Sequence, residues 1–169
     1  MITTPDPLSQ SALRAATEEC LVAATIATEV PPNPTGAFTA EMIPLAIRAV
    51  AEVMDNRTRA PQFAKTALGV VLQPKQFSGV MRGITAAALG HRDIWLDAVS
   101  GAWKPDHVAR CLAEWRRLAR NPEPRLAPGA LFYYSPSGMI PKGRVPDWVA
   151  NLTPVPLVGV SEEFFRFFR

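Results

Sequence analysis

Prolines limit where the helices of this chain can end. The chain carries 17 prolines among its 169 residues, and a proline inside a helix costs about 3 kcal/mol because it removes a hydrogen bond and clashes with the preceding turn. A helix that starts at Pro7 therefore cannot run far past Glu29, because Val30 is followed by Pro31-Pro32-Asn33-Pro34. Small and apolar residues recur along one side of this helix and predict close helix packing: Leu13, Ala16, Cys20, Ala23, Ala24 and Ala27.

Glu29, at the predicted end of this helix, is a candidate acidic catalytic group. Its simplest explanation is a solvent-exposed carboxylate. However, a helix C-terminus carries partial negative charge, which disfavours a carboxylate. That field raises the pKa of the carboxyl group and suits it to act as an acid near neutral pH. Glu41 is the competing candidate, but it falls in the first turn of a second predicted helix after Thr39, where an acidic side chain is ordinary.

A second helix and then a polar segment are expected between residues 39 and 78. Apolar residues recur at three- and four-residue intervals, the period of a helix with one buried face: Ile43, Ala46, Ile47, Val50 and Met54. This helix is expected to stop near Asn56, ahead of Pro61. The apolar run 68–72 is too short for a convincing helix, and it leads into Gln73-Pro74-Lys75-Gln76-Phe77-Ser78. The two glutamines, the phenylalanine and the serine are a combination that can bind a sugar.

The rest of the chain predicts three more helices and a small sheet. Short helices are expected at 85–91 and 93–102. A longer helix is expected from Asp106, its predicted N-cap, to Asn121-Pro122-Glu123-Pro124. The run Ala130-Leu131-Phe132-Tyr133-Tyr134 predicts a strand.

Aromatic residues near the C-terminus have two possible uses. Trp148 is expected to pack beneath a loop, with stacking on a sugar as the alternative. The tail 162–169 holds four phenylalanines and ends in arginine. Packing is the expected role of this tail, and contact with a membrane surface is the alternative.

Several classes of catalytic site are excluded by the residue pattern. His91, His107, Cys20 and Cys111 do not have metal-ligand spacing, and neither a metal nor another cofactor is expected. No Gly-rich phosphate loop and no Gly-x-Ser-x-Gly nucleophile setting occurs. Both cysteines are expected to be buried free thiols, and the acidic neighbours of Cys20 raise a thiol pKa rather than lower it. Catalysis by a carboxyl group is the remaining possibility among these classes.

Carboxyl chemistry on glycosides usually needs two carboxylates across the scissile bond. Asp55, Asp93 and Asp97 are possible second carboxylates. Each of them has an ordinary surface explanation, so the residue pattern alone supplies no clear second group.

The order of several motifs resembles the cell-wall hydrolase family typified by the spore-cortex-lytic enzymes. The matching residues run from Asn56-Arg57 through Pro61, Phe63 and Gly69-Val70-Val71 to the block 73–78, and a Tyr-Tyr-x-Pro block follows at 133–136. The resemblance spans roughly Leu21 to the C-terminus. It implies a mainly helical α+β fold, lysozyme-like and two-lobed, with a small β-sheet.

The resemblance also implies an activity. The family is considered to include lytic transglycosylases, which cut the bond between N-acetylmuramic acid and N-acetylglucosamine with one essential acid. That acid corresponds to Glu29, and the substrate-binding positions correspond to Gln73, Gln76, Phe77, Ser78, Tyr133 and Tyr134. One tyrosine is expected to steady positive charge on the sugar ring. A hydrolytic muramidase is the nearest alternative.

Three departures from the family pattern keep a different class of function open. The usual Ala-Arg-Gly-Glu continuation after the acid is replaced by Val30-Pro31-Pro32-Asn33-Pro34, Ser135 replaces an asparagine, and the usual histidine near 160–163 is not evident. The alternative is a catalytically silent wall-binding or virion structural protein of the same fold.

The length and charge of the chain bear on the number of domains and on the partner. One catalytic domain over residues 1–169 fits the chain length, and we expect a monomer. The net charge of +3 and the pI near 9.2 favour an anionic partner. Peptidoglycan strands are the expected partner, and no nucleic-acid pattern is present. The N-terminus shows no secretory signal pattern. We therefore expect synthesis in the cytoplasm and action at the cell wall after release, as for a phage or prophage endolysin.

Overall fold

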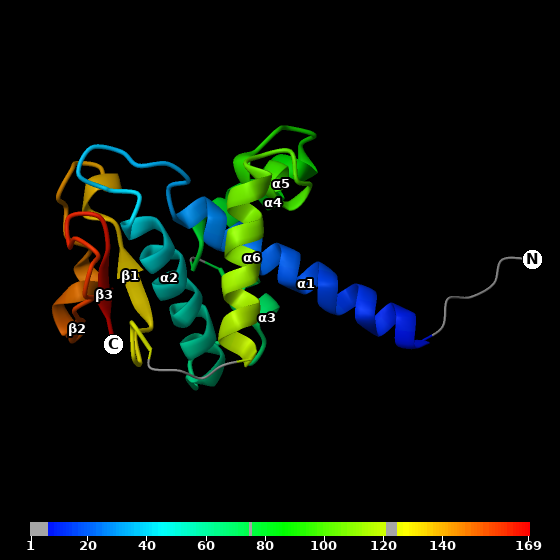
Figure 1. Ribbon diagram of the computed structural model, residues 1–169, viewed down its shortest axis with the longest axis horizontal. Coiled ribbons are helices and arrows are strands. Elements are labelled where there is room, and N and C mark those ends of the chain that lie inside the picture. The colour runs from blue at the N-terminus through cyan, green and yellow to red at the C-terminus, as the bar shows by residue number, and fades with distance from the viewer. Residues whose placement is uncertain (1–6, 75, 121–124) are drawn as a thin grey trace, which may run out of the picture.

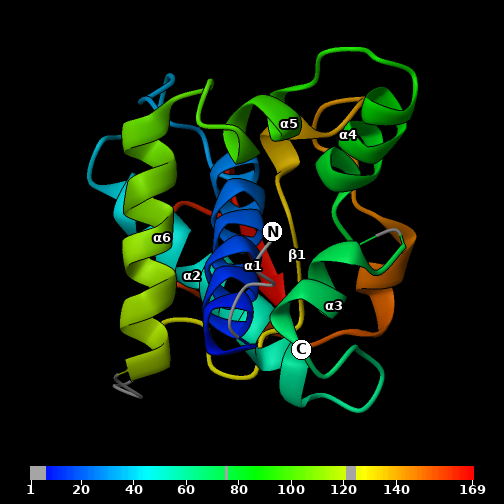
Figure 2. The same ribbon diagram turned by 90° about the vertical axis from the view of Figure 1, so that its right-hand side faces the viewer.

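Helix α1 (Pro7–Glu29) is the central element of the helical part. The structure is a computed structural model, and it describes residues 7–74, 76–120 and 125–169. Within that part α1 contacts every other helix: α2 (Met42–Arg59), α3 (Ala67–Leu72), α4 (Ser78–Ala88), α5 (Ile94–Val99) and α6 (Pro105–Arg120). Figure 2 looks along α1, with α6 on its left and α3 and α4 on its right. Ala23, Ala24 and Ala27 are fully buried, so the small side chains allow this close packing.

Helix α1 ends at Glu29, as its sequence predicts. Val30 still donates its backbone N–H to Ile26, and the prolines then carry the chain away in a loop. Phe38 at the end of that loop is fully buried. Its ring lies 5.1 Å from that of Phe164 and 6.2 Å from that of Phe165, so the loop is attached to the C-terminal segment.

Helix α2 runs past Asn56, where the sequence predicted its end, and stops at Arg59. Ala60 is the first residue with extended backbone, at ψ 138°, because it immediately precedes Pro61. The proline therefore acts on its direct neighbour only. The extra turn places Asn56 and Arg57 on the helix, and both are buried.

The expectation that the run 68–72 is too short for a helix is wrong, because these residues belong to the short helix α3 (Ala67–Leu72). Thr66 caps it by accepting a hydrogen bond from the Gly69 N–H at 3.0 Å, which stabilises even a short helix. Helix α4 begins at Ser78, well before the predicted start at 85.

Helices α5 and α6 match their predicted positions closely. Asp93 caps α5 by accepting from the Trp95 N–H at 2.8 Å. Helix α6 starts at Pro105, so Asp106 lies in its first turn and is not the N-cap. The predicted stop at 121–124 lies outside the described residues.

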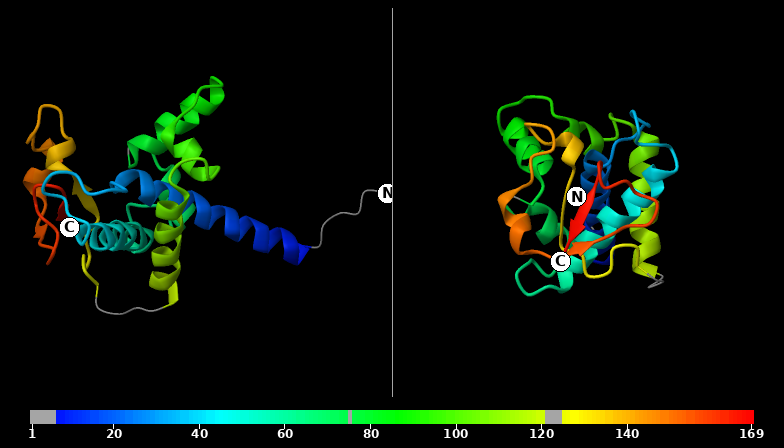
Figure 3. Two further views of the ribbon diagram at one scale, coloured as in Figure 1. Left: turned by 45° about the horizontal axis from the view of Figure 1, so that its top comes forward. Right: turned by 90° about the vertical axis from the view of Figure 1, so that its left-hand side faces the viewer.

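Three short strands form an antiparallel sheet with the order β1-β3-β2: β1 (Phe132–Tyr134), β2 (Pro154–Val155) and β3 (Arg166–Phe168). Tyr133 of β1 lies opposite Phe167 of β3, and Val155 of β2 lies opposite the same phenylalanine. Figures 1 and 3 show the sheet at one end of the molecule, beside α2. The central strand is thus the C-terminal segment of the chain.

The aromatic tail packs inside the protein. Phe165, Phe167 and Phe168 are buried, at 4%, 2% and 5% exposure. Packing, the expected role of these phenylalanines, is therefore confirmed. The expected fold class, α+β and mainly helical with a small sheet, is confirmed as well.

The cysteines match their prediction only in part. Both are free thiols, and Cys111 is buried with a pKa raised to about 12 by that burial. Cys20 is exposed. Its position on α1 therefore faces solvent, and the predicted burial of Cys20 is wrong.

Candidate active site

The end of helix α1 and the first strand meet through Glu29 and Tyr133. The Tyr133 hydroxyl donates a hydrogen bond of 3.0 Å to Oε2 of Glu29, across 104 residues of sequence. The Tyr133 ring is held by Phe167, at 5.6 Å between ring centroids, and by Phe165, at 6.2 Å. Both Glu29 and Tyr133 are half-buried. An acid and a phenol from distant parts of the chain are therefore in direct contact.

The protonation of Glu29 is displaced toward the neutral form. Burial raises the pKa of its carboxyl group, whereas the Tyr133 hydrogen bond and the charges of Arg57 and Arg82 lower it by smaller amounts. The direction of the shift agrees with the sequence-based expectation. Its main cause is desolvation, not the helix end from which we predicted it. A carboxyl group with a raised pKa can donate a proton near neutral pH.

Tyr133 remains a protonated hydrogen-bond donor at neutral pH. Burial and the neighbouring Glu29 raise its pKa well above the ordinary value. A protonated hydroxyl next to a carboxylate favours the charged form of that carboxylate. Tyr133 is therefore suited to hold the glutamate after proton donation.

Arg57 lies beside this pair, and sequence reasoning did not assign it a role. The residue is buried, at 4% exposure. The Nε atom donates to the carbonyl oxygen of Leu131 at 2.7 Å, two residues before Tyr133. Its position could have been found from the sequence, because Arg57 follows Val50 and Met54 by seven and three residues and so continues the apolar face of α2.

Two more buried side chains of α2 hold the segment that leads into β1. The Asn56 Nδ2 donates to the carbonyl oxygens of Ala127 and Ala130, at 3.1 and 3.0 Å. The Glu52 Oε2 accepts from the Ala127 N–H at 2.7 Å, and its Oε1 pairs with Arg48 at 3.1 Å. These contacts hold the start of β1 in place relative to α2, and so help to position Tyr133 beside Glu29.

The predicted sugar-binding block 73–78 divides into packing and exposed groups. The Gln73 Oε1 accepts from the Ala64 N–H at 3.3 Å and so closes a local loop. Phe77 is 1% exposed and lies under the Arg57 guanidinium, at 5.2 Å, so it supports the site from beneath. Gln76 is half-buried and Ser78 is exposed.

Ser78 is exposed and both Gln73 and Gln76 are half-buried, so these three side chains have surface available to a ligand, although the Gln73 Oε1 is held by the Ala64 N–H. Ser78 is the first residue of α4. The next residue, Gly79, packs against α1: a Cβ atom on Gly79 would lie 3.7 Å from the Thr28 hydroxyl. The start of α4 consequently lies next to the residue that precedes Glu29.

Tyr134 points away from Glu29, because successive residues of a strand face opposite sides. Its ring stacks on Phe168 at 6.0 Å and meets the edge of Trp148 at 5.9 Å. Trp148 packs against this aromatic face but is 42% exposed. The prediction that it lies beneath a loop is therefore wrong. The structure thus brings Tyr133 to the acid and leaves Tyr134 on the other side of the sheet.

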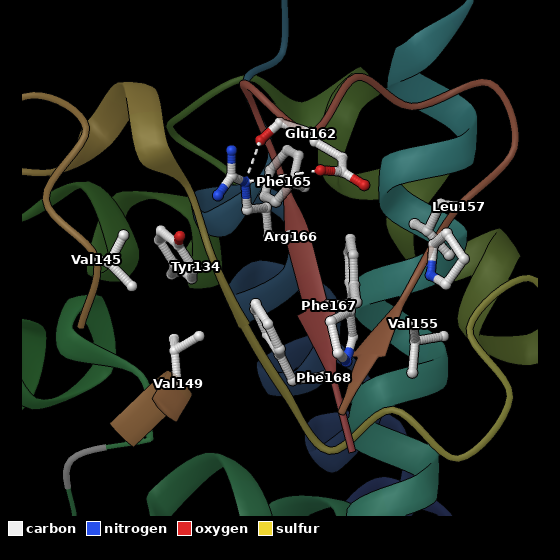
Figure 4. Close-up of a pocket in the computed structure, with 12 residues that line it drawn as sticks. Tyr134, Val145, Val149, Val155, Leu157, Glu162, Phe165, Arg166, Phe167 and Phe168 are labelled. Atoms are coloured by element: carbon white, nitrogen blue, oxygen red, sulfur yellow. Dashed lines mark hydrogen bonds and ion pairs between the residues drawn. The ribbon is translucent and has the colours of Figure 1, made fainter. Parts of the chain in front are cut away.

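A cavity of about 270 Å³ lies along the sheet near Tyr134. Figure 4 shows Val145, Val149, Tyr134 and Phe168 on one side of β3 and Val155 and Leu157 on the other. Arg166 and Glu162 close one end of it. Glu29 and Tyr133 do not line this cavity, so it is separate from the acid.

The competing carboxylates have other partners or full exposure. Glu41 is exposed at the start of α2, and a hydrogen bond from Thr39 lowers its pKa. Asp55 pairs with Arg59 and Arg125, Asp93 with Arg82, and Asp97 with Arg92. Glu29 is the carboxyl group of this set with a raised pKa and a phenol partner.

No group of three histidine, cysteine or acidic side chains among the described residues is arranged to hold a metal ion. No helix in the described ranges is long and apolar enough to cross a membrane.

Known proteins resemble this chain in sequence pattern and in fold. No curated protein sequence matches it. The catalytic domain of the germination-specific lytic transglycosylase SleB from Bacillus anthracis superposes with a TM-score of 0.55 at 18% identity, covering 90% of this chain and 94% of that one. The catalytic domain of the Bacillus cereus SleB protein has a TM-score of 0.49 at 19% identity, with 91% of each chain covered. At this identity the first likeness shows the fold.

The family follows from the sequence pattern. The family model named Cell Wall Hydrolase matches residues 45–165, well over half of the chain. The match contains Arg57, the block 73–78 and Tyr133, and it begins after Glu29. This chain therefore belongs to the cell wall hydrolase family, which confirms the resemblance in its motifs and the expectation of a cell-wall-degrading enzyme.

Proposed function

We propose that this protein is a lytic transglycosylase that cleaves peptidoglycan between N-acetylmuramic acid and N-acetylglucosamine. The contact between Glu29 and Tyr133 carries this proposal, because it provides one carboxyl group with a raised pKa and a fixed phenol partner. Family membership and the likeness of fold to a lytic transglycosylase domain support it.

In the first step Glu29 donates its proton to the glycosidic oxygen. The bond between that oxygen and C1 of the muramic residue breaks, and the electron pair stays on the departing oxygen. Positive charge then develops at the sugar ring, and Glu29 has become a carboxylate. The Tyr133 hydroxyl favours this charged form through its hydrogen bond.

In the second step Glu29 acts as a base. The 6-hydroxyl oxygen of the same muramic residue bonds to C1, and its proton passes to the Glu29 carboxylate. The product is a 1,6-anhydro end, and the enzyme returns to its starting protonation without consuming water. One carboxyl group suffices for both steps, whereas the usual glycosidase pair needs two.

Within this proposal the glycan strand contacts Gln76 and Ser78. Both have exposed surface, and Ser78 starts the helix that packs beside Thr28. Gln73 and Phe77 support the site by packing. Within the proposal the protein is a monomer that acts at the cell wall after release, as an endolysin of a phage or prophage does.

The decisive experiment measures the clearing of a suspension of purified peptidoglycan. Wild type is expected to clear it, and Glu29→Gln is expected to fold and to lose clearing by about a hundredfold or more. Glu41→Gln is the matched control, because it removes the competing acid at an exposed position. Loss in Glu41→Gln with activity kept in Glu29→Gln would move the acid to residue 41.

Mass spectrometry of the released fragments separates the two reaction types. Anhydro-muramic ends are expected. Reducing muramic ends would instead identify a hydrolytic muramidase, in which water takes the place of the 6-hydroxyl.

A second candidate is a catalytically silent wall-binding or virion structural protein of this fold. It is favoured by the stretch after Glu29, which departs from the family pattern, and by the family match, which begins at residue 45. Co-sedimentation with peptidoglycan without any clearing by wild type would support it, and rapid clearing would exclude it.

A further inference from the structure

The Arg57 side chain is a buried cation beside Glu29. The residue is 4% exposed, and its Nη1 has no hydrogen-bond partner within the described part of the chain. No carboxylate of the described residues pairs with it at salt-bridge distance. A buried charge of this kind disfavours folding unless other groups compensate for it, so its place beside Glu29 calls for an explanation.

Three aromatic rings and one carbonyl oxygen surround the guanidinium. Its central carbon lies 5.2 Å from the Phe63 and Phe77 ring centroids and 6.0 Å from that of Phe132. Nε donates to the Leu131 carbonyl at 2.7 Å. These partners belong to the loop after α2, the approach to α4 and strand β1. One side chain therefore joins the segments around the acid.

Strand β1 connects Arg57 to Tyr133. Leu131 and Phe132 directly precede Tyr133, and both contact Arg57. A shift of the guanidinium would move the strand and lengthen the bond between Tyr133 and Glu29. The rigid planar guanidinium, with its donors in a fixed geometry, suits this role better than an ammonium group.

We infer that Arg57 is a positioning residue for the proposed reaction: it holds β1 so that Tyr133 meets Glu29, and its charge stabilises Glu29 after proton donation. The inference rests on the proposed function for its catalytic consequence. Its structural part, the effect of Arg57 on Glu29, does not depend on which substrate is cut.

The charged and titratable neighbours of Glu29 come from several elements. Tyr133 lies on β1, Arg57 on α2 and Arg82 on α4, and Arg82 pairs with Asp93, the N-cap of α5. His107 of α6 bonds to the carbonyl of Val30, the next residue. The charges of Arg57 and Arg82 both favour the carboxylate and lower its pKa, and that of Arg57 has the larger effect.

The first test follows the Glu29 carboxyl by ¹³C NMR titration in wild type, Arg57→Met, Arg57→Lys and Arg59→Met. Arg57→Met removes the charge, so the Glu29 midpoint is expected to move to higher pH. Arg57→Lys keeps the charge, so a smaller upward shift is expected. Arg59→Met is the matched control, because Arg59 is 58% exposed in its side chain and pairs with Asp55; no shift is expected. An unchanged midpoint in folded Arg57→Met would overturn the inference.

The second test measures kcat and KM on soluble peptidoglycan fragments. Arg57→Lys is expected to lower kcat by about tenfold or more through misplacement of Tyr133, with KM little changed. Combined with Tyr133→Phe, its effect is expected to be less than additive, because both changes act through one contact. Additive losses would overturn the inference and would leave Arg57 with a packing role alone.

The two hypotheses fail in different ways. A wild type that cuts no peptidoglycan, yet shows the Arg57-dependent titration of Glu29, would reject the proposed function and keep the Arg57 contact. A wild type that cuts peptidoglycan, with Glu29 titration insensitive to Arg57, would do the opposite. If Arg57→Met does not fold, Arg57→Lys decides through its titration and its double-variant cycle.

Discussion

The imidazole of His107 donates a hydrogen bond from Nε2 to the carbonyl oxygen of Val30 at 3.0 Å. Helix α6 thereby holds the residue that directly follows Glu29. The carbonyl acceptor assigns the proton to Nε2, and Nδ1 is buried without a partner among the described residues. A neutral ring meets these conditions, whereas a charged ring would bury an unpaired N–H.

The stability of the protein should depend on pH through His107. Burial lowers its pKa, with the charge of Arg110 adding to the effect, while the backbone of Val30, its hydrogen-bond acceptor, and that of Ala27 oppose it. Since the folded pKa lies below the unfolded one, the stabilisation is present above the unfolded value, near 6.5, and is lost as pH falls through the folded pKa. Urea denaturation from pH 7.5 to 5 should show this decline.

Two variants of His107 test the contact itself. His107→Leu removes the donor and is expected to cost about 1–3 kcal/mol, because the Val30 carbonyl loses its partner. His107→Gln offers an amide N–H and is expected to cost less and to flatten the decline with pH. Equal stability of wild type and His107→Leu would show that the hydrogen bond contributes nothing.

Glu29 should lower the stability of the folded protein at neutral pH. Its folded pKa lies above the unfolded value, so its favourable contribution is present at low pH and is lost as pH rises through the folded pKa. Glu29→Gln stays neutral and can still accept from Tyr133. It is expected to be more stable than wild type at pH 7, with the difference shrinking toward pH 4, as measured by thermal unfolding. A difference independent of pH would contradict this reading.

Tyr133 and Tyr134 should differ sharply in their effect on activity. Tyr133→Phe removes the donor to Glu29. This change raises the Glu29 pKa further and moves the alkaline limb of the pH–rate profile to higher pH. A loss of kcat of about tenfold to a hundredfold is expected. Tyr134→Phe keeps its stack on Phe168 and should leave the profile unchanged. Equal losses in both would restore Tyr134 to the substrate-binding role implied by the family pattern.

Two glycines of α4 offer a matched stability test. A Cβ on Gly83 would lie 2.7 Å from Trp95 Cε3, and Trp95 is fixed to α1 by its hydrogen bond to Thr25 at 3.0 Å. Gly83→Ala is therefore expected to destabilise the protein by about 1–3 kcal/mol. Gly79→Ala meets Thr28 at an ordinary 3.7 Å and should be neutral or stabilising, since alanine favours a helix. Urea denaturation of both variants provides the comparison.

Helix ends illustrate how far local sequence rules reach. The prolines after Val30 end α1 at the predicted residue, because steric restriction by proline acts on immediate neighbours. The same rule, applied too early at Asn56, missed a turn of α2 and with it the burial of Arg57. The short helix α3 was missed because its cap at Thr66 and its packing against α1 compensate for its length.

The sequence by itself determined the helix that ends in Glu29, the strand that carries two adjacent tyrosines and the order of motifs that identifies the family. Periodicity, proline sterics and strand alternation are local properties, so they can be read along the chain. Only the tertiary structure decided which tyrosine meets Glu29, that burial raises its pKa, and that Arg57 lies beside it. Those outcomes depend on contacts across as many as 104 residues, which the packing of α1, α2 and the sheet determines.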